Sequence, residues 1–161
     1  MSSNLREYLS PSFRLSEFVR SQAAINLGLD NTPGPQAIEN LRQLCIHVLQ
    51  PVRNHFALPV RINSGFRSAN LNRAIGGALS SQHMLGEAAD IEIEGVSNAH
   101  LWEFISKLPA YDQVIAEYLE ANDPNAGWVH VSYRKDRNRK EAISCISRGV
   151  FLKGLHFVNG R

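Results

Sequence analysis

The chain has 161 residues and a formal net charge of +2, with 43% apolar and 20% charged side chains. This length fits one domain, and the composition is that of an ordinary globular protein rather than a disordered, collagen-like or coiled-coil one. The basic residues are scattered except in the segment 134–140, which argues against nucleic acid as the main partner.

The cysteine content and the N-terminus indicate the compartment. Cys45 and Cys145 are too few for a disulfide framework or a thiolate metal site. Residues 1–9 are polar and do not resemble a signal peptide, and no stretch approaches the roughly 20 apolar residues of a membrane helix. We therefore expect a protein that is kept in a cytosol unless another machine releases it, and that does not insert into a membrane.

The first third of the chain is predicted to be helical. Ser16 is a suitable N-cap for a helix that ends near Gly28, and the Pro- and Gly-containing stretch 29–35 follows it. Pro51 is expected to end or kink the second helix near Gln50. The apolar face of this second helix recurs at helical spacing and comprises Ile38, Leu41, Cys45, Val48, Leu49 and Val52.

The middle of the chain alternates apolar and polar residues as strands do. The runs 60–64 and 89–94 both show this pattern, and a short helix capped by Ser68 and ended by Gly76 lies between them. In the second run the isoleucines face the core. Asp90 is therefore expected on the other, accessible face of the sheet.

One more helix and two strands complete the predicted fold. The helix is capped by Ser97 and stops before Pro109, and the strands cover 113–118 and 128–133. These elements predict a small single α+β domain, with an antiparallel sheet flanked by helices. The domain at 1–161 divides into a helical N-terminal part, a core that carries the candidate site, and a C-terminal segment, at 1–56, 57–133 and 134–161.

Three polar residues in the core have side chains suited to metal binding. His83 stands in a glycine-punctuated loop, seven residues before Asp90 on its strand. Imidazole and carboxylate are suitable zinc ligands, and catalytic zinc usually takes three protein ligands and a water. Alternation in 128–132 displays His130 opposite two core-facing valines. Spacing alone leaves open both a metal site and an ordinary hydrogen-bonded pair.

Several ordered sequence blocks resemble a known family. They are Ser81-x-His83-x-x-Gly86-x-Ala88-x-Asp90, the segments 63–68 and 76–78 before it, and the segment 127–131 after it. Together they resemble the zinc D-Ala-D-Ala carboxypeptidase and endopeptidase family over about residues 60–133. That family includes bacterial D,D-dipeptidases and the L-alanyl-D-glutamate endolysins of bacteriophages.

The resemblance implies a zinc site on the sheet. His83, Asp90 and His130 would bind Zn²⁺, and a metal-activated water would attack a peptide carbonyl. Arg67 would hold a substrate carboxylate, for which a guanidinium offers a planar fork of donors.

Two further residues are candidate substrate contacts. The hydroxyl of Ser81 would touch substrate or orient a ligand, and Trp128 would form a wall of the cleft. A turn-forming serine and an ordinarily packed tryptophan are the alternative interpretations.

The general base departs from the best-known pattern of the family. Many relatives have a glutamate three residues before the last ligand, where this chain has Gly127, and others have a histidine where Trp128 stands. We expect Glu117 to act as the base, because antiparallel pairing of its strand with that of His130 brings the two side chains together. The alternative for Glu117 is a solvated strand carboxylate.

The function implied is hydrolysis of an amide bond in peptidoglycan peptides by a monomeric phage or prophage protein that lyses or remodels the wall. It would act from the host cytoplasm after a holin opens the membrane, or as part of a virion. The motifs do not encode which bond is cut. A catalytically inactive, zinc-stabilised wall-binding or structural module is the alternative, whereas the near-neutral charge disfavours a nucleic-acid-binding regulator.

Overall fold

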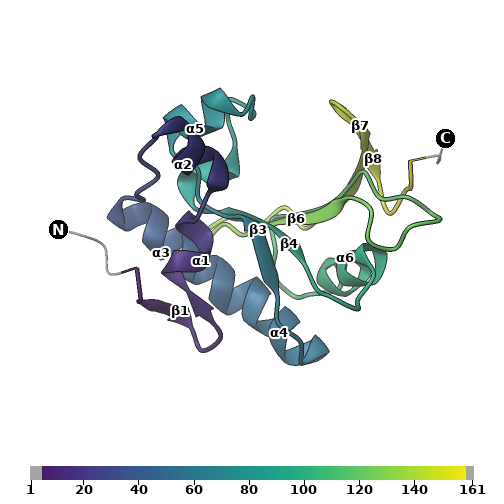
Figure 1. Ribbon diagram of the computed structural model, residues 1–161. Coiled ribbons are helices and arrows are strands. Elements are labelled where there is room, and N and C mark those ends of the chain that lie inside the picture. Colours follow the sequence, from purple (N-terminus) through teal and green to yellow (C-terminus); the bar gives the residue numbers. More distant parts are fainter. Residues whose placement is uncertain (1–4, 159–161) are drawn as a thin grey trace.

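The computed structural model describes residues 5–158 and centres on a six-stranded sheet (Figure 1). The strand order is β3-β4-β6-β5-β7-β8, and β5 and β7 are the parallel neighbours. The α+β class is confirmed, but the expected antiparallel sheet is mixed, because the chain reverses after β6 and crosses to the far side of β5. The strands are β3 (Arg61–Ser64), β4 (Ala88–Glu92), β5 (Gln113–Glu117), β6 (Trp128–Ser132), β7 (Glu141–Ser147) and β8 (Val150–Lys153).

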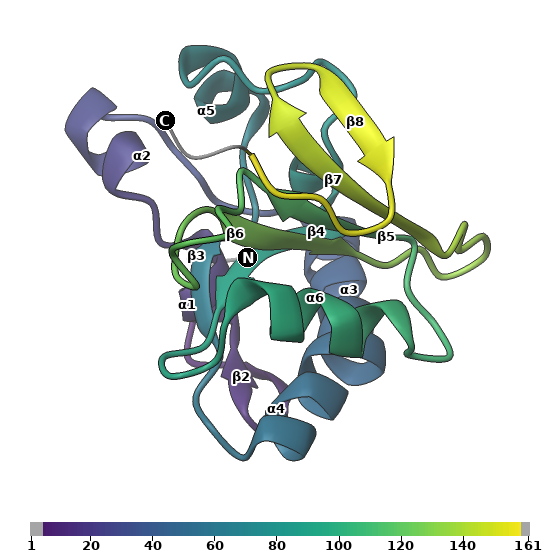
Figure 2. The same ribbon diagram turned by 90° about the vertical axis from the view of Figure 1, so that its right-hand side faces the viewer.

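The helices divide between the two faces of this sheet. Figure 2 shows α3, α4 and α6 below the sheet and α5 above it, on the side toward which the β7–β8 end of the sheet curls. The lower helices are α3 (Pro35–Leu44), the π-helical η1 (Cys45–Leu49), α4 (Gln50–Phe56) and α6 (Asn98–Ser106). No helix among residues 5–158 is both long and apolar enough to cross a membrane.

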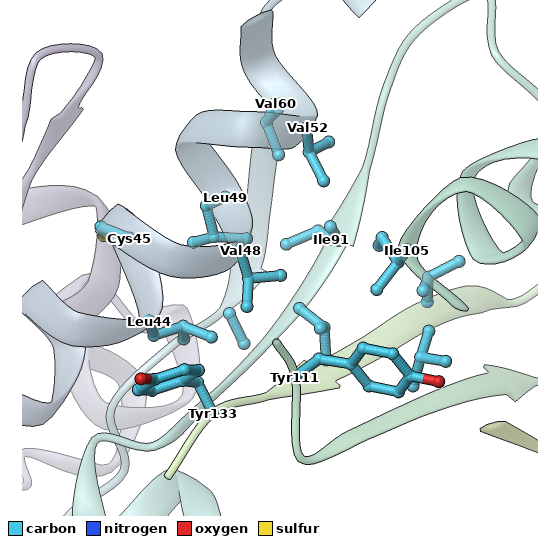
Figure 3. Packing of buried hydrophobic residues seen from close by; sticks show 14 of the residues in the cluster. Leu44, Cys45, Val48, Leu49, Val52, Val60, Ile91, Ile105, Tyr111 and Tyr133 are labelled. Atoms are coloured by element: carbon cyan, nitrogen blue, oxygen red, sulfur yellow. The ribbon is translucent and has the colours of Figure 1, made fainter. Parts of the chain in front are cut away.

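The core lies between the lower helices and the sheet. Val48, Leu49 and Val52 gather around Ile91 of β4, with Ile105 of α6 on the other side (Figure 3). All five side chains are fully buried, which accounts for the apolar spacing of the second predicted helix. Because Ile91 of β4 points into this core, Asp90 and Glu92 on either side of it point to the upper face.

The first predicted helix is two helices in the structure. Extended backbone at Arg20 and Ser21 interrupts it, and the hydroxyl of Ser21 caps the second piece by accepting from Ala24 N. The predicted end at Gly28 is confirmed, where φ is +63°. This region comprises β1 (Tyr8–Ser10), β2 (Phe13–Arg14), α1 (Leu15–Val19) and α2 (Gln22–Leu27).

Pro51 does not end the second helix, although the regular α-helical hydrogen bonding is interrupted just before Gln50, where an end or a kink was predicted. The π turn of η1 precedes it, and Gln50 N donates to the carbonyl of Cys45, five residues back. Pro51 then occupies the first turn of α4, directly after the π turn. The helical path therefore continues from 35 to 56.

The remaining predicted elements are confirmed. Ser68 caps α5 (Ala69–Ala74) and Ser97 caps α6, each by accepting a backbone N–H. Strands β3 to β6 lie where the alternation placed them. The N-terminal hairpin and the strands β7 and β8 were not predicted. The N-terminal stretch 1–9 was predicted to be polar, and its positions 1–4 lie outside the described residues.

Candidate metal centre

Strand register brings two of the predicted ligands side by side on the upper face of the sheet. Asp90 pairs with His130 across β4 and β6, and Ser64 of β3 pairs with Asp90 on the other side. Directly cross-strand side chains share a face. The third residue, His83, lies in the 3₁₀ turn η2 (Gln82–Leu85), which enters β4 and carries the imidazole over the same row.

The three side chains meet at distances that suit a tetrahedral ion. His83 Nε2 lies 3.3 Å from His130 Nδ1 and 3.4 Å from Asp90 Oδ1, and the last two atoms are 3.0 Å apart. Ligands about 2.0–2.1 Å from a tetrahedral zinc are separated by about 3.3–3.4 Å. The donor set therefore fits one face of a zinc tetrahedron and leaves the fourth position to a non-protein ligand.

The imidazole of His83 is held in the form that binds a metal. Its Nδ1 donates to the carbonyl of Gly65 at 2.7 Å, so the lone pair of Nε2 points into the centre. Burial lowers the pKa of His83, against the opposing effect of the Asp90 carboxylate. The neutral, ligating form is therefore favoured.

Asp90 lies on the predicted face but is not accessible. Only 8% of it is exposed, because the two histidines and Arg67 cover it. Burial acts to raise the pKa of Asp90, but interactions with His83 and a hydrogen bond with His130 outweigh it and hold the pKa far below its ordinary value. The carboxylate is therefore ionised, as a metal ligand must be.

Arg67 contacts the carboxylate of Asp90. Its Nη2 donates to Asp90 Oδ2 at 2.9 Å, and its Nε donates to Ser64 Oγ at 2.9 Å. Oδ1 of Asp90 is thereby left facing the histidines. Nη1 of Arg67 makes no hydrogen bond among residues 5–158, so one donor edge remains for the predicted contact with a substrate carboxylate.

Glu117 stands on the same face, one diagonal step from His130. It pairs with Trp128, while Ile115 pairs with His130. Burial raises the pKa of Glu117, and the electrostatic effects of His130, Asp90 and Arg67 also act on it. The mutually close ligand atoms come from His83, Asp90 and His130, and Glu117 is not among them. Glu117 therefore lies on the same face as the centre but outside the ligand set, and its carboxylate also interacts with Cys145 of β7. Its part as the base stays a prediction.

The backbone explains the absence of a glutamate at position 127. Gly127 has φ +69°, and a Cβ there would lie 1.9 Å from the carbonyl oxygen of Glu117. A side chain at this position is excluded by the β5–β6 turn itself.

Ser81 and Trp128 lie beside the centre but make no contact that fixes a role. Ser81 lies just before η2. Its hydroxyl caps no backbone N–H there, whereas its backbone carbonyl accepts from Met84 N. The half-buried ring of Trp128 leans against Tyr118 with centroids 5.6 Å apart. Their parts in substrate binding remain predictions.

A buried support behind His83 was not predicted. The carboxylate of Asp112 is fully buried and accepts from Gln82 Nε2 at 3.0 Å and from Arg139 Nη2 at 2.7 Å. Gln82 directly precedes the ligand His83. Arg139 belongs to the basic segment 134–140, so part of this segment is a structural clamp. The one sequence feature that could have indicated this support is the position of Asp112, an aspartate directly before the apolar strand β5.

Known proteins place this site in a family. A family model described as Peptidase M15 matches residues 11–132, which include every predicted site residue. The chain belongs to the Peptidase M15 family. A 33-residue stretch is 52% identical to the zinc D-Ala-D-Ala carboxypeptidase of Streptomyces albus G, covering 20% of this chain and 13% of that protein. The chain thus matches about an eighth of that relative's length. The family and the His–Asp–His cluster together identify Zn²⁺ as the cofactor.

Proposed function

We propose that this Peptidase M15 chain is a zinc peptidase that hydrolyses an amide bond in peptides of bacterial peptidoglycan. The observation that carries the proposal is the set of three donor atoms 3.0–3.4 Å apart. Glu117, whose pKa is raised by burial, lies on the same face of the sheet, diagonal to His130. A buried titratable group beside a metal cluster is typical of hydrolytic sites.

The residues divide the chemistry as follows. A bound zinc polarises the scissile carbonyl and lowers the pKa of water. His83, Asp90 and His130 hold it, and Gly65 and Arg67 orient two of these ligands through their other polar atoms.

Proton transfer falls to Glu117 and substrate orientation to the flanking residues. Glu117 takes a proton from the attacking water and returns it to the leaving nitrogen. Arg67 holds a substrate carboxylate with its free donor edge, while Ser81 and Trp128 bound the cleft.

The biological setting is part of the same proposal. We propose a monomeric phage or prophage protein that lyses or remodels the wall, reaching it through a holin-opened membrane or within a virion. Its support is the resemblance of the motif blocks to phage-type peptidases. Lysis of cells that express the chain together with a holin, compared with a His130→Ala variant, tests this setting.

Digestion of purified peptidoglycan tests the activity. Incubation with the zinc-loaded protein should release peptide fragments that mass spectrometry identifies, and a chelator should abolish the release. The masses also show which bond is cut. Zinc binding without any released fragment would instead support a zinc-stabilised wall-binding module.

A further inference from the structure

A groove of about 880 Å³ runs along the outer edge of β3 and opens beside the metal centre. Its inner end is lined by Arg67, which donates to Asp90, and by Ser64, which pairs with Asp90 across β3 and β4. Residues 20–23, at the start of α2, line its opposite wall. Figure 1 shows α2 and α5 on the same side of β3. The groove therefore continues the candidate active site along the sheet edge.

The edge of β3 has free hydrogen-bonding groups facing this groove. β3 is the first strand of the sheet, and within the described chain no backbone hydrogen bond joins 61–64 to a segment other than β4. Just beyond the strand, Phe66 N donates to the carbonyl of Phe18, which closes the edge there. An open edge of this kind pairs with an extended peptide.

The spare hydrogen-bond donors in the groove are two guanidiniums, while two carboxylates in the lining balance their charge. Glu92 accepts from Asn63, and Glu17 accepts from the backbone N–H of the residue before α1, so both carboxylates already have hydrogen-bond partners. Glu92 is also the cross-strand neighbour of Arg61. Arg20 and Arg61 are exposed, line the groove and have no hydrogen bond or ion pair in the part of the chain that is described. Two unengaged guanidiniums favour a carboxylate ligand.

We propose that this groove binds the substrate peptide as an added strand, and that Arg20 and Arg61 bind a side-chain carboxylate on it. Arg61 precedes Ser64 by three residues, which corresponds to about 10 Å of strand. The carboxylate therefore lies about three residues from the bond that is cut. The inference rests on the proposed function and specifies its substrate as an acidic, extended peptide.

Calorimetric titration with a matched pair of peptides tests the subsite. The probe is a synthetic peptidoglycan stem peptide with free side-chain carboxylates, and its partner has the same sequence with those groups amidated. The protein is the zinc-loaded full chain carrying Glu117→Gln, so that binding is measured without turnover. We expect the acidic peptide to bind about tenfold more tightly, and Arg20→Gln/Arg61→Gln to remove this preference.

Arg73→Gln is the matched control, since Arg73 is an exposed cation on α5 outside the groove. This variant should keep the preference, and zinc content should be unchanged throughout. Equal binding of the two peptides, or an unchanged preference in the double variant, would overturn the subsite. A preference that follows the prediction, in a chain whose zinc-loaded wild type cleaves nothing, would leave the subsite standing and refute the peptidase.

N-methylation of the peptide tests the strand geometry separately. Methylating single amides in turn should weaken binding at alternate positions, because only every second amide of an added strand faces its neighbour. An equal effect at every position would contradict strand addition.

Discussion

Glu117 and Gly127 lie at the two ends of the β5–β6 connection, where the backbone of Glu117 explains why residue 127 is a glycine. The carbonyl of Glu117 fills the space in which a side chain at 127 would lie. The same turn leaves the carboxylate of Glu117 half-buried on the face that carries His130. In the proposed mechanism the base therefore comes from the neighbouring strand and not from the strand of the last ligand.

Replacement of Glu117 by Gln should separate metal binding from turnover. Glu117→Gln keeps the shape of the side chain but cannot accept the proton, so kcat should fall by roughly 10²–10⁴ while bound zinc is retained. Kinetics and metal analysis of the same preparation check this. Glu120→Gln, in the exposed loop that follows, is the control. An unchanged kcat would remove Glu117 from the mechanism.

The raised pKa of Glu117 predicts the direction of two pH effects. The base works when ionised, so activity should rise with pH through a pKa above the ordinary 4.5, and this limb should vanish in Glu117→Gln. A carboxyl whose folded pKa is raised stabilises the fold below its unfolded pKa and loses that contribution as pH rises. Glu117→Gln should therefore melt at a higher temperature than the wild type at pH 7. A lower melting temperature would contradict the burial argument.

At the scale of elements, the turn η2 depends on a support that lies outside the motif. Gln82 links the turn to the buried Asp112, which is also bound by Arg139 from the loop before β7. The position of His83 thus depends on three segments far apart in the sequence. Burial acts to raise the pKa of Asp112, but hydrogen bonds from Arg139 outweigh it, so the pKa is lowered.

Asp112→Asn should weaken both the fold and the metal site. Losing charge-assisted hydrogen bonds costs about 1.5–3 kcal/mol, and a loosened η2 turn should raise the Kd for zinc. Thermal unfolding and a competitive zinc titration measure the two effects. Asp136→Asn, an exposed acid of the same loop region, should change neither.

The stabilisation by Asp112 should depend on pH. The stability contributed by Asp112 is present above its ordinary pKa of 3.8 and is lost as pH falls through its lower folded value. The difference in stability between wild type and Asp112→Asn should therefore shrink below pH 4. A difference that grows on acidification would contradict the assignment.

Local signals made some elements predictable and distant contacts hid others. Ser68 and Ser97 cap their helices through bonds to residues three positions ahead, so the sequence alone indicated them. The π turn before Pro51 was not predicted, because packing of its buried residues in the core stabilises it. β7 pairs with β5 in the sheet, although β6 lies between these two strands in the sequence. No local sequence pattern encodes such a pairing. The three candidate ligands were predicted from the resemblance of the motif blocks to a zinc peptidase family, because spacing alone left open an ordinary hydrogen-bonded pair.

At the scale of the whole molecule, the metal would join elements that the sheet and its helices bring together. Two ligands lie on adjacent strands and the third on the turn that enters the sheet. Without an ion, two imidazoles and a carboxylate face one another at 3.0–3.4 Å. Ligand binding to the folded state alone stabilises it in proportion to the logarithm of ligand concentration over Kd.

Zinc should therefore raise the melting temperature. At free zinc about 100 times Kd the gain is about 2.7 kcal/mol, which corresponds to roughly 5–10 °C for a domain of this size. Calorimetric scans with and without chelator measure the shift. Asp90→Ala should show no zinc-dependent shift, and a shift equal to that of the wild type would place the metal elsewhere.

The zinc content of purified protein tests the central claim most directly. After dialysis against a weak chelator, the wild type and an exposed-histidine control, His156→Ala, should each retain one zinc per chain. His83→Ala, Asp90→Ala and His130→Ala should retain almost none. Full zinc retention in any of these three variants, or none in the wild type, would contradict the assignment of the centre.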